Sequence, residues 1–261
     1  MSVSAADRLL AAFALPPEER VDQRVPKKLL LEHGAPTAAD RRLVQDALEA
    51  LVWVAVLKPA TVGVPAYRGE GRDYGELAVL AATLRPGVRP AQAARLAERV
   101  HRAVPYPVAL VLGAGDGAAT LSLAHKRRAA TGGDATVAEL PAAEATLGAG
   151  DGAPDPVEAA FLAALRVGAA PAAHLFALYD GWVDGVAALD AARVTGRWGV
   201  AATPEAALAR RAALGEHARL RREAAALRAA AGRERQLARR VALNLDLRRL
   251  DARLTELAST L

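Results

Sequence analysis

Cysteine is absent from this chain of 261 residues. The absence excludes a disulfide framework, a thiolate metal site and a cysteine nucleophile. Histidine is also sparse, and no two of the five histidines have the spacing of metal ligands. We therefore expect neither a metal site nor a cofactor.

Long apolar runs are missing as well. No window holds about 18 uncharged apolar residues, which argues against a membrane-spanning helix. Residues 1–20 contain five charged side chains and no cleavable apolar stretch, so no signal peptide is evident. These features predict a protein of the bacterial cytoplasm without a membrane partner.

Aromatic residues make up only 4% of the chain, although 52% of its residues are hydrophobic. A chain of this length can bury about three quarters of its unfolded surface, so its core needs no covalent cross-link. The length fits one large domain, or one domain with an appendage.

Positive charge is concentrated in the last part of the chain. Residues 204–261 hold thirteen arginines against seven acidic residues, a local charge of +6, whereas the whole chain carries +5. The first two hundred residues are therefore close to neutral. A neutral body with a basic arm indicates a protein that docks on a partner or faces nucleic acid.

Apolar runs in the first half of the chain predict a sheet. Segments 51–57 and 76–84 have the length of strands, and an amphipathic helix is predicted over 91–103. Two further runs, 108–112 and 119–124, flank a Gly-Asp-Gly turn and predict a β-hairpin. The order strand–strand–helix–hairpin favours an α+β fold with a mostly antiparallel sheet and flanking helices, followed by a C-terminal helical arm.

Flanking segments supply other expected elements. Ser4–Ala14 has the pattern of a short amphipathic helix, and Thr37 is expected to cap a second helix with Asp40 at its third position. Residues 67–74 are rich in glycine and charge and are expected to form a loop. Residues 136–140 are expected to add a further strand.

A Gly- and Pro-rich linker at Leu147–Pro156 separates the two expected domains, an α+β domain at 1–150 and a helical region at 151–261. Gly232 is expected to mark a turn between two helices. Beyond it, leucines recur at alternating spacings of four and three, which predicts a helical hairpin or a short coiled coil. This leucine seam consists of Leu243, Leu247, Leu250, Leu254 and Leu257, and it continues to Leu261.

Four short stretches of the chain resemble the signatures of one protein family. They are Arg24–Leu29 followed by Glu32-His33, Trp53 with Leu57-Lys58-Pro59, Val104–Pro107 with Ala124–Arg127, and Glu234–Gln236 with Val241–Asn244. By these residues, in this order, the chain resembles the bacterial domain of unknown function 4391 family.

The resemblance implies an α+β body with a C-terminal helical arm. It also implies a neighbourhood of helicases and DNA methyltransferases in antiphage or restriction-like clusters. The family has no assigned chemistry, so the resemblance implies no activity.

No motif in the chain points to catalysis. Gly113–Gly117 is followed by a strand and not by a helix, so we expect a hairpin turn and no phosphate cradle. Glu76 and Lys126 fall near strand ends, but the acid-x-Lys pair of restriction-type nucleases is missing. A nuclease-like enzyme is therefore the least favoured hypothesis.

Cations in the first 150 residues are candidate binding groups. They are Arg24, Lys27 and Lys28, together with Lys126, Arg127 and Arg128. If the two groups converge, they would form a positive surface for phosphate or an acidic partner; otherwise they are ordinary solvated side chains. Tyr106, between two prolines, could stack on a base or pack at the start of a strand.

The arginine-rich arm allows two interpretations. Its cations could hold nucleic acid through phosphate contacts, with a steep dependence on salt. Its mixed charge is also typical of a solvated helix, in which case the leucine seam is the working surface. We favour a non-catalytic accessory protein of a bacterial DNA-processing or antiphage defence assembly, which binds a protein partner or itself through the seam. Direct nucleic-acid binding is the alternative.

Overall fold

The computed structural model describes residues 3–129, 136–150, 154–169 and 172–261. The chain divides into two compact units, Met1–Val186 and Ala187–Leu261. The boundary predicted at residue 150 lies inside the first unit. Part of the predicted linker, residues 151–153, lies outside the described residues.

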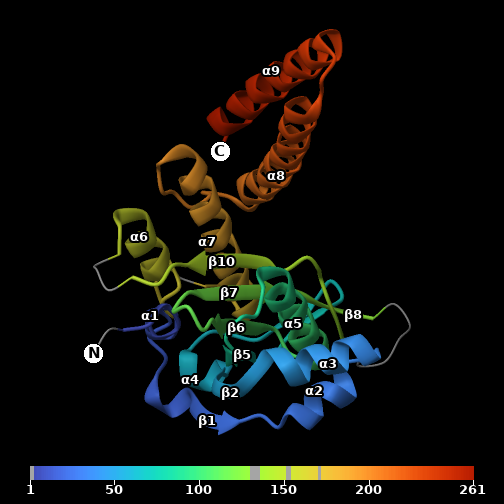
Figure 1. The fold of residues 1–261 in the computed structure, drawn as a ribbon. Coiled ribbons are helices and arrows are strands. Elements are labelled where there is room, and N and C mark those ends of the chain that lie inside the picture. The colour runs from blue at the N-terminus through green and yellow to red at the C-terminus, as the bar shows by residue number, and fades with distance from the viewer. Residues whose placement is uncertain (1–2, 130–135, 151–153, 170–171) are drawn as a thin grey trace. The chain divides into compact units, whose positions relative to one another are not determined.

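A six-stranded sheet forms the centre of the first unit (Figure 1). Its strands are, in spatial order, β1 (Arg20–Arg24), β2 (Leu48–Leu57), β5 (Leu77–Leu84), β6 (Val108–Gly113), β7 (Ala119–Ala124) and β10 (Ala143–Leu147). Every neighbouring pair is antiparallel except β5 and β6, which run parallel. The predicted α+β fold with a mostly antiparallel sheet is confirmed.

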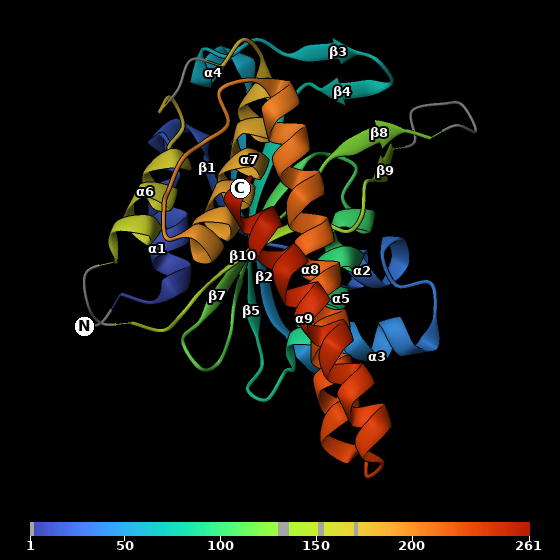
Figure 2. The same cartoon turned by 90° about the horizontal axis from the view of Figure 1, so that it is seen from above.

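Helices cover both faces of this sheet, as the two views show (Figures 1 and 2). One face carries α2 (Lys27–His33), α3 (Ala38–Ala47) and α5 (Pro90–Ala103), and α5 is the crossover between the parallel strands. The other face carries α1 (Ala5–Ala12), α6 (Pro156–Ala164) and the first part of α7 (Leu175–Thr195).

Successive residues of the central strands point into these two helical layers. Leu80 of β5 and Leu110 of β6 share a core cluster with Leu96 of α5. Their neighbours Val79 and Val111 are also buried, on the opposite face. Strands that are covered on both faces read as continuous apolar runs, which is why these two were visible in the sequence.

Two short hairpins lie outside the main sheet. The first pairs β3 (Tyr67–Gly69) with β4 (Arg72–Tyr74), and the second pairs β8 (Lys126–Arg128) with β9 (Thr136–Ala138). The loop predicted over 67–74 is therefore wrong. Glu70 and Gly71 have φ values of 50° and 72°, which is the geometry of a tight two-residue hairpin turn. The remaining short elements are a 3-10 turn, Pro17–Glu19, and the helix α4 (Pro59–Val62).

Asp40 connects the helix that it caps to a neighbouring helix. The Thr37 hydroxyl accepts from the Asp40 amide at 3.1 Å and donates to the Asp40 carboxylate at 2.7 Å. Arg95 of α5 donates to the same buried carboxylate at 2.9 Å, and Arg99 lies 3.7 Å from it. The Thr37 hydrogen bond, followed by that of Arg95, lowers the pKa of Asp40 to about 2.

We expect Asp40→Asn to lower the free energy of unfolding of the first unit at pH 7. The variant should also lose less stability than the native chain when the pH is lowered. Because the folded pKa lies below the ordinary value, the ionised carboxylate stabilises the fold above about pH 4 and loses this effect as the pH falls towards 2. Urea unfolding at pH 7, 4 and 3 measures the difference, which should shrink with acid. A constant difference at all three pH values would contradict this assignment.

The second unit contains a helical hairpin made by α8 (Pro204–Arg233) and α9 (Leu237–Ser259). The two helices lie side by side and run antiparallel in both views (Figures 1 and 2). Arg228 of α8 donates to Asp251 of α9 at 2.6 Å, an exposed contact between the two helices. Gly232 lies in the last turn of α8, so the predicted turn follows it directly.

Candidate functional site

Two adjoining hollows on the first unit share Pro105 and Tyr106 in their walls. The first has a mixed wall with charged side chains and a volume of about 420 Å³, and we call it the polar hollow; the other is apolar, with about 160 Å³. We call the two hollows together the Tyr106 site. Tyr106 is 39% exposed and its ring lies 6.4 Å from that of Trp53, which lines the apolar hollow.

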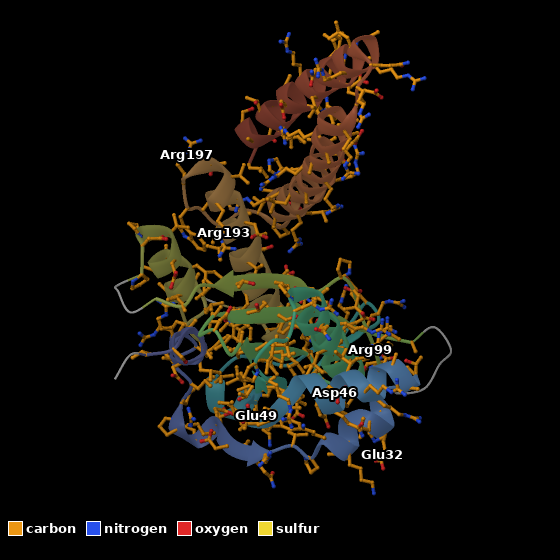
Figure 3. All side chains as sticks on the ribbon, in the orientation of Figure 1. Glu32, Asp46, Glu49, Arg99, Arg193 and Arg197 are labelled. Atoms are coloured by element: carbon orange, nitrogen blue, oxygen red, sulfur yellow. The ribbon has the colours of Figure 1, made fainter. Side chains whose placement is uncertain are left out.

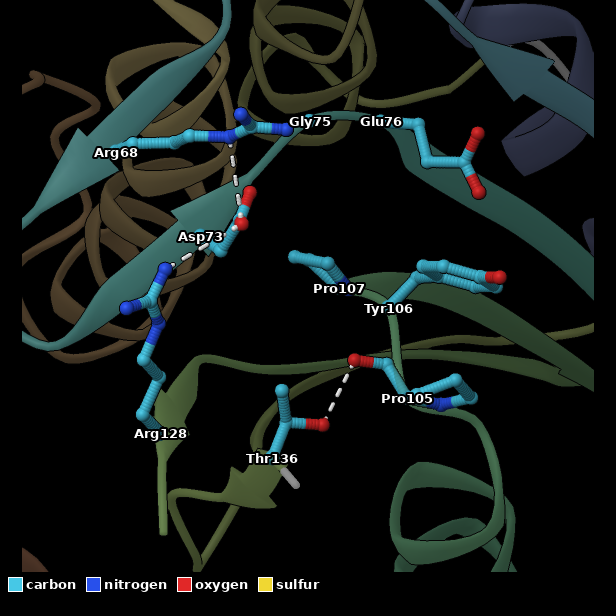
Figure 4. A pocket seen from close by; sticks show the side chains of 9 residues that line it. All are labelled: Arg68, Asp73, Gly75, Glu76, Pro105, Tyr106, Pro107, Arg128 and Thr136. Carbon is cyan, nitrogen blue, oxygen red and sulfur yellow. Dashed lines mark hydrogen bonds and ion pairs between the residues drawn. The ribbon is translucent and has the colours of Figure 1, made fainter. Parts of the chain in front are cut away.

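The polar hollow is dominated by two arginines that share one carboxylate (Figure 4). Arg68 Nε lies 3.4 Å from Asp73 Oδ2, and Arg128 Nη2 lies 3.7 Å from the same oxygen. Thr136 closes one side by donating to the Pro105 carbonyl at 2.8 Å. Glu76 lies on the rim, and its carboxylate points away from Arg128 (Figure 4). Two arginines and two acidic residues line this hollow, so its charges balance.

The apolar hollow has hardly any polar group in its wall. Aliphatic side chains form most of it, among them Val25 between β1 and α2, Leu29 of α2 and Leu80 of β5, and His33 also lines it. Leu29 is 46% exposed, so part of this surface faces solvent. Such a hollow suits an apolar group and not a hydrogen-bonding one.

The parallel pair of strands places the Tyr106 site. Because β5 and β6 run in the same direction, the residues that precede them, Glu76 and Pro107, come to the same edge of the sheet. The two prolines disfavour the helical conformation of the residues before them, so α5 ends and the short connection to β6 bends at Pro105 and Tyr106. This connection presents Tyr106 between the two hollows.

Lys126 supports that connection from inside the protein. It is 1% exposed, and its ammonium group donates to the carbonyls of His101 and of Val104, the latter at 2.7 Å. It therefore caps the C-terminal end of α5, where carbonyl groups lack helical partners. Burial lowers the pKa of Lys126 to about 8. The prediction of Lys126 as a surface cation is wrong, because its ammonium group is buried and hydrogen-bonded inside the protein.

The other predicted cations differ in their surroundings. Lys27 donates to the Leu48 carbonyl, and Lys28 lies 3.7 Å from the Glu32 carboxylate on an exposed face. Arg24 on β1 and Arg127 on β8 are exposed. Arg128 lines the polar hollow, together with Arg68 and Asp73, which the sequence analysis did not select. The sequence signal for Arg68 and Asp73 was the Glu-Gly turn between them, which closes the hairpin on which both residues lie.

A buried polar chain in the first unit resembles a hydrolase triad in composition. His101 Nε2 lies 3.1 Å from Ser122 Oγ, which donates to Glu144 at 3.3 Å. Both His101 and Ser122 are fully buried, and burial lowers the pKa of His101 to about 3. A substrate cannot reach this serine, so these three side chains form an internal hydrogen-bond network.

The leucine seam of α9 faces α8 within the hairpin. Leu247 is buried and the other seam leucines are partly covered, while most other side chains of α9 are exposed. The matching row on α8 includes the buried residues Leu220, Ala224 and Ala231. The seam that was expected to bind a partner is thus occupied inside the chain.

A second apolar row lies on the opposite side of α9. Leu237, Val241 and Leu245 are 67%, 49% and 50% exposed. They recur every four residues, a helical signal that the sequence analysis did not use. We call these three residues the outer face of α9.

No group of three or more histidine, aspartate and glutamate side chains in the described part of the chain is arranged to hold a metal ion. Among the described helices, none is both long and apolar enough to cross a membrane.

Comparison with known proteins places the chain in a family. A search of curated proteins and a search of solved structures each found no match. A family model described as Domain of unknown function (DUF4391) matches residues 13–254 of the 261. This range contains all four stretches that carry the sequence resemblance. The chain belongs to the DUF4391 family.

Proposed function

We propose that this chain is a non-catalytic accessory protein of a bacterial DNA-processing or antiphage defence assembly, and that it binds a protein partner through the outer face of α9. The observation that carries the proposal is this exposed apolar row on a helix whose seam is already occupied. Aliphatic side chains in such a row cost solvation free energy unless a partner covers them.

The two apolar rows of α9 are well separated. At 3.6 residues per turn, Leu245 and Leu247 point about 200° apart around the helix axis. Contact with α8 therefore covers the seam and leaves the outer face open. A helix that is apolar on two opposite sides has the pattern of an element packed between two neighbours.

The charge around the outer face favours an acidic partner. Nitrogen-bearing side chains stand out along both helices of the hairpin (Figure 3). Arg240 and Arg248 form no ion pair within the described residues, and residues 204–261 carry +6. Two copies of this surface would repel each other, so we propose an acidic protein with exposed aliphatic side chains in preference to self-association.

Replacing Val241 and Leu245 with aspartate is expected to weaken the affinity for the partner by at least about tenfold. The hairpin should stay helical. The native chain and the variant are isolated under identical conditions and their bound proteins are compared, with Leu208→Asp as the matched control. Leu208 is also an exposed aliphatic residue, at 65%, but lies on α8. Equal recovery with all three chains would refute docking at this face.

Exposed arginines of α8, such as Arg221 and Arg222, keep nucleic-acid binding as the second candidate. Binding to phosphates would fall steeply with salt. Titration with duplex and single-stranded DNA from about 50 mM salt upwards decides between the two. If the variant with Val241→Asp and Leu245→Asp still binds DNA, and this binding weakens with salt, direct nucleic-acid binding would replace our proposal.

A further inference from the structure

We propose that the Tyr106 site is a second docking point, which binds a short segment of a partner protein carrying a large aliphatic side chain next to a carboxylate. The segment would place its aliphatic side chain in the apolar hollow and its carboxylate on Arg68 and Arg128. This inference rests on the first unit alone and does not depend on the function proposed for the arm.

The apolar hollow has the size and chemistry for one aliphatic side chain. Its volume is about 160 Å³, and a dry apolar cavity of about 150 Å³ is known to hold a molecule as large as benzene. Leu29 and Val25 form its walls with Trp53 at one side. An anchor side chain buried in a pocket of this kind supplies much of the binding free energy of a peptide.

A nucleobase fits this hollow less well than an aliphatic group. The edges of a base carry donors and acceptors, and each one buried without a partner costs about 1–3 kcal/mol. The wall offers His33 and the backbone connection at Tyr106, and otherwise hydrocarbon. Stacking on Tyr106 alone would leave the apolar hollow unused.

The polar hollow is suited to a single carboxylate. Arg68 and Arg128 contact Asp73 only at 3.4 and 3.7 Å, and both arginine side chains are half exposed or more, so donors remain for a second acceptor. A guanidinium group binds a carboxylate through two parallel hydrogen bonds. Asp73 and Glu76 balance the two arginines, and a neutral hollow does not favour the successive phosphates of a nucleic-acid strand.

The two hollows meet at Tyr106, so their ligands must be close neighbours in one chain. Adjacent or next-but-one residues of an extended peptide satisfy this condition. Pro105 and Tyr106 belong to both walls and would lie beneath the peptide between its two anchoring residues. The occupant is therefore a protein segment that combines an aliphatic and an acidic residue.

A random dodecapeptide phage library panned on the full chain tests the proposal. We expect enriched peptides that pair leucine, isoleucine or methionine with a neighbouring aspartate or glutamate. Leu29→Asp and Arg128→Glu are expected to weaken the best synthetic peptide by about tenfold or more. Val200→Asp and Arg166→Glu, which change exposed residues outside both hollows, serve as controls and should bind as the native chain does.

A charge exchange makes the test specific. Arg128→Glu should regain affinity for a peptide whose acidic residue is replaced by lysine, which a merely unfolded variant cannot do. Enrichment of no sequence, enrichment of peptides without an acidic residue, or loss of binding in the control variants would overturn the proposal. Tighter binding of oligothymidine than of any enriched peptide would assign the site to single-stranded nucleic acid instead.

Discussion

Replacing Leu247 and Leu250 with aspartate is expected to separate α9 from α8 and to leave the first unit folded. Each leucine in the seam contributes about 1.5–3 kcal/mol when it is fully buried, and a charge placed between two helices adds a desolvation cost. Most of the stability of a helix in a protein comes from packing of its apolar face, so much of the helicity of α9 should disappear without that packing. Far-UV circular dichroism and limited proteolysis at the arginines of α9 measure the loss.

The outer-face variant is the matched control for this experiment. Val241→Asp with Leu245→Asp also adds two aspartates to α9, but on the exposed side, so helicity and protease resistance should be kept. If the seam variant were as helical and as resistant as the native chain, the packing of α9 on α8 would not hold the hairpin. The pair of variants thus separates the internal role of the seam from docking at the outer face.

Tyr179→Phe is expected to destabilise the first unit by about 1–3 kcal/mol, and Tyr179→Ala by about 3–5 kcal/mol. The buried Tyr179 hydroxyl donates to the Val108 carbonyl at 2.7 Å and accepts from the Ala124 amide at 2.9 Å. It therefore fastens α7 to β6 and β7. Burial raises the pKa of Tyr179 well above the ordinary value, so the phenol stays a neutral donor. Urea unfolding followed by tryptophan fluorescence measures both losses.

Tyr106→Phe is the control for this substitution, because it removes the same hydroxyl from an exposed ring. Its effect should stay within about 0.5 kcal/mol. Trp182, in the same helix as Tyr179, packs against that ring at 6.0 Å and reports on the same core. Equal unfolding midpoints for Tyr179→Phe and Tyr106→Phe would show that the buried hydroxyl does not anchor α7.

Local patterns predicted much of the secondary structure. The apolar runs of β5 and β6 were visible because both faces of these strands are buried, and Thr37 was visible as a cap because its bonds reach only three residues along the chain. The hairpin at 67–74 was missed, because its strands are short and its turn uses Glu-Gly in place of the more frequent Asn-Gly.

The candidate sites were less accessible to local reasoning. Tyr106 was selected for its position between two prolines, but Arg68 and Asp73 come from a segment that was expected to be irregular. Lys126 was placed on the surface by its charge. A lysine head group buried against the end of a helix depends on carbonyls more than twenty residues away, which a local pattern does not contain.

The amino-acid sequence by itself determined the α+β class, the family, the positions of the central strands and the heptad spacing of α9, since each depends on periodicity or on neighbours within a few residues. Tertiary structure decided which of the two apolar rows of α9 remains exposed, which cations keep free head groups, and that two hollows meet at Tyr106. These properties arise from contacts between segments that are distant in the chain. The free energy of such contacts depends on how the segments pack together, which no single segment encodes.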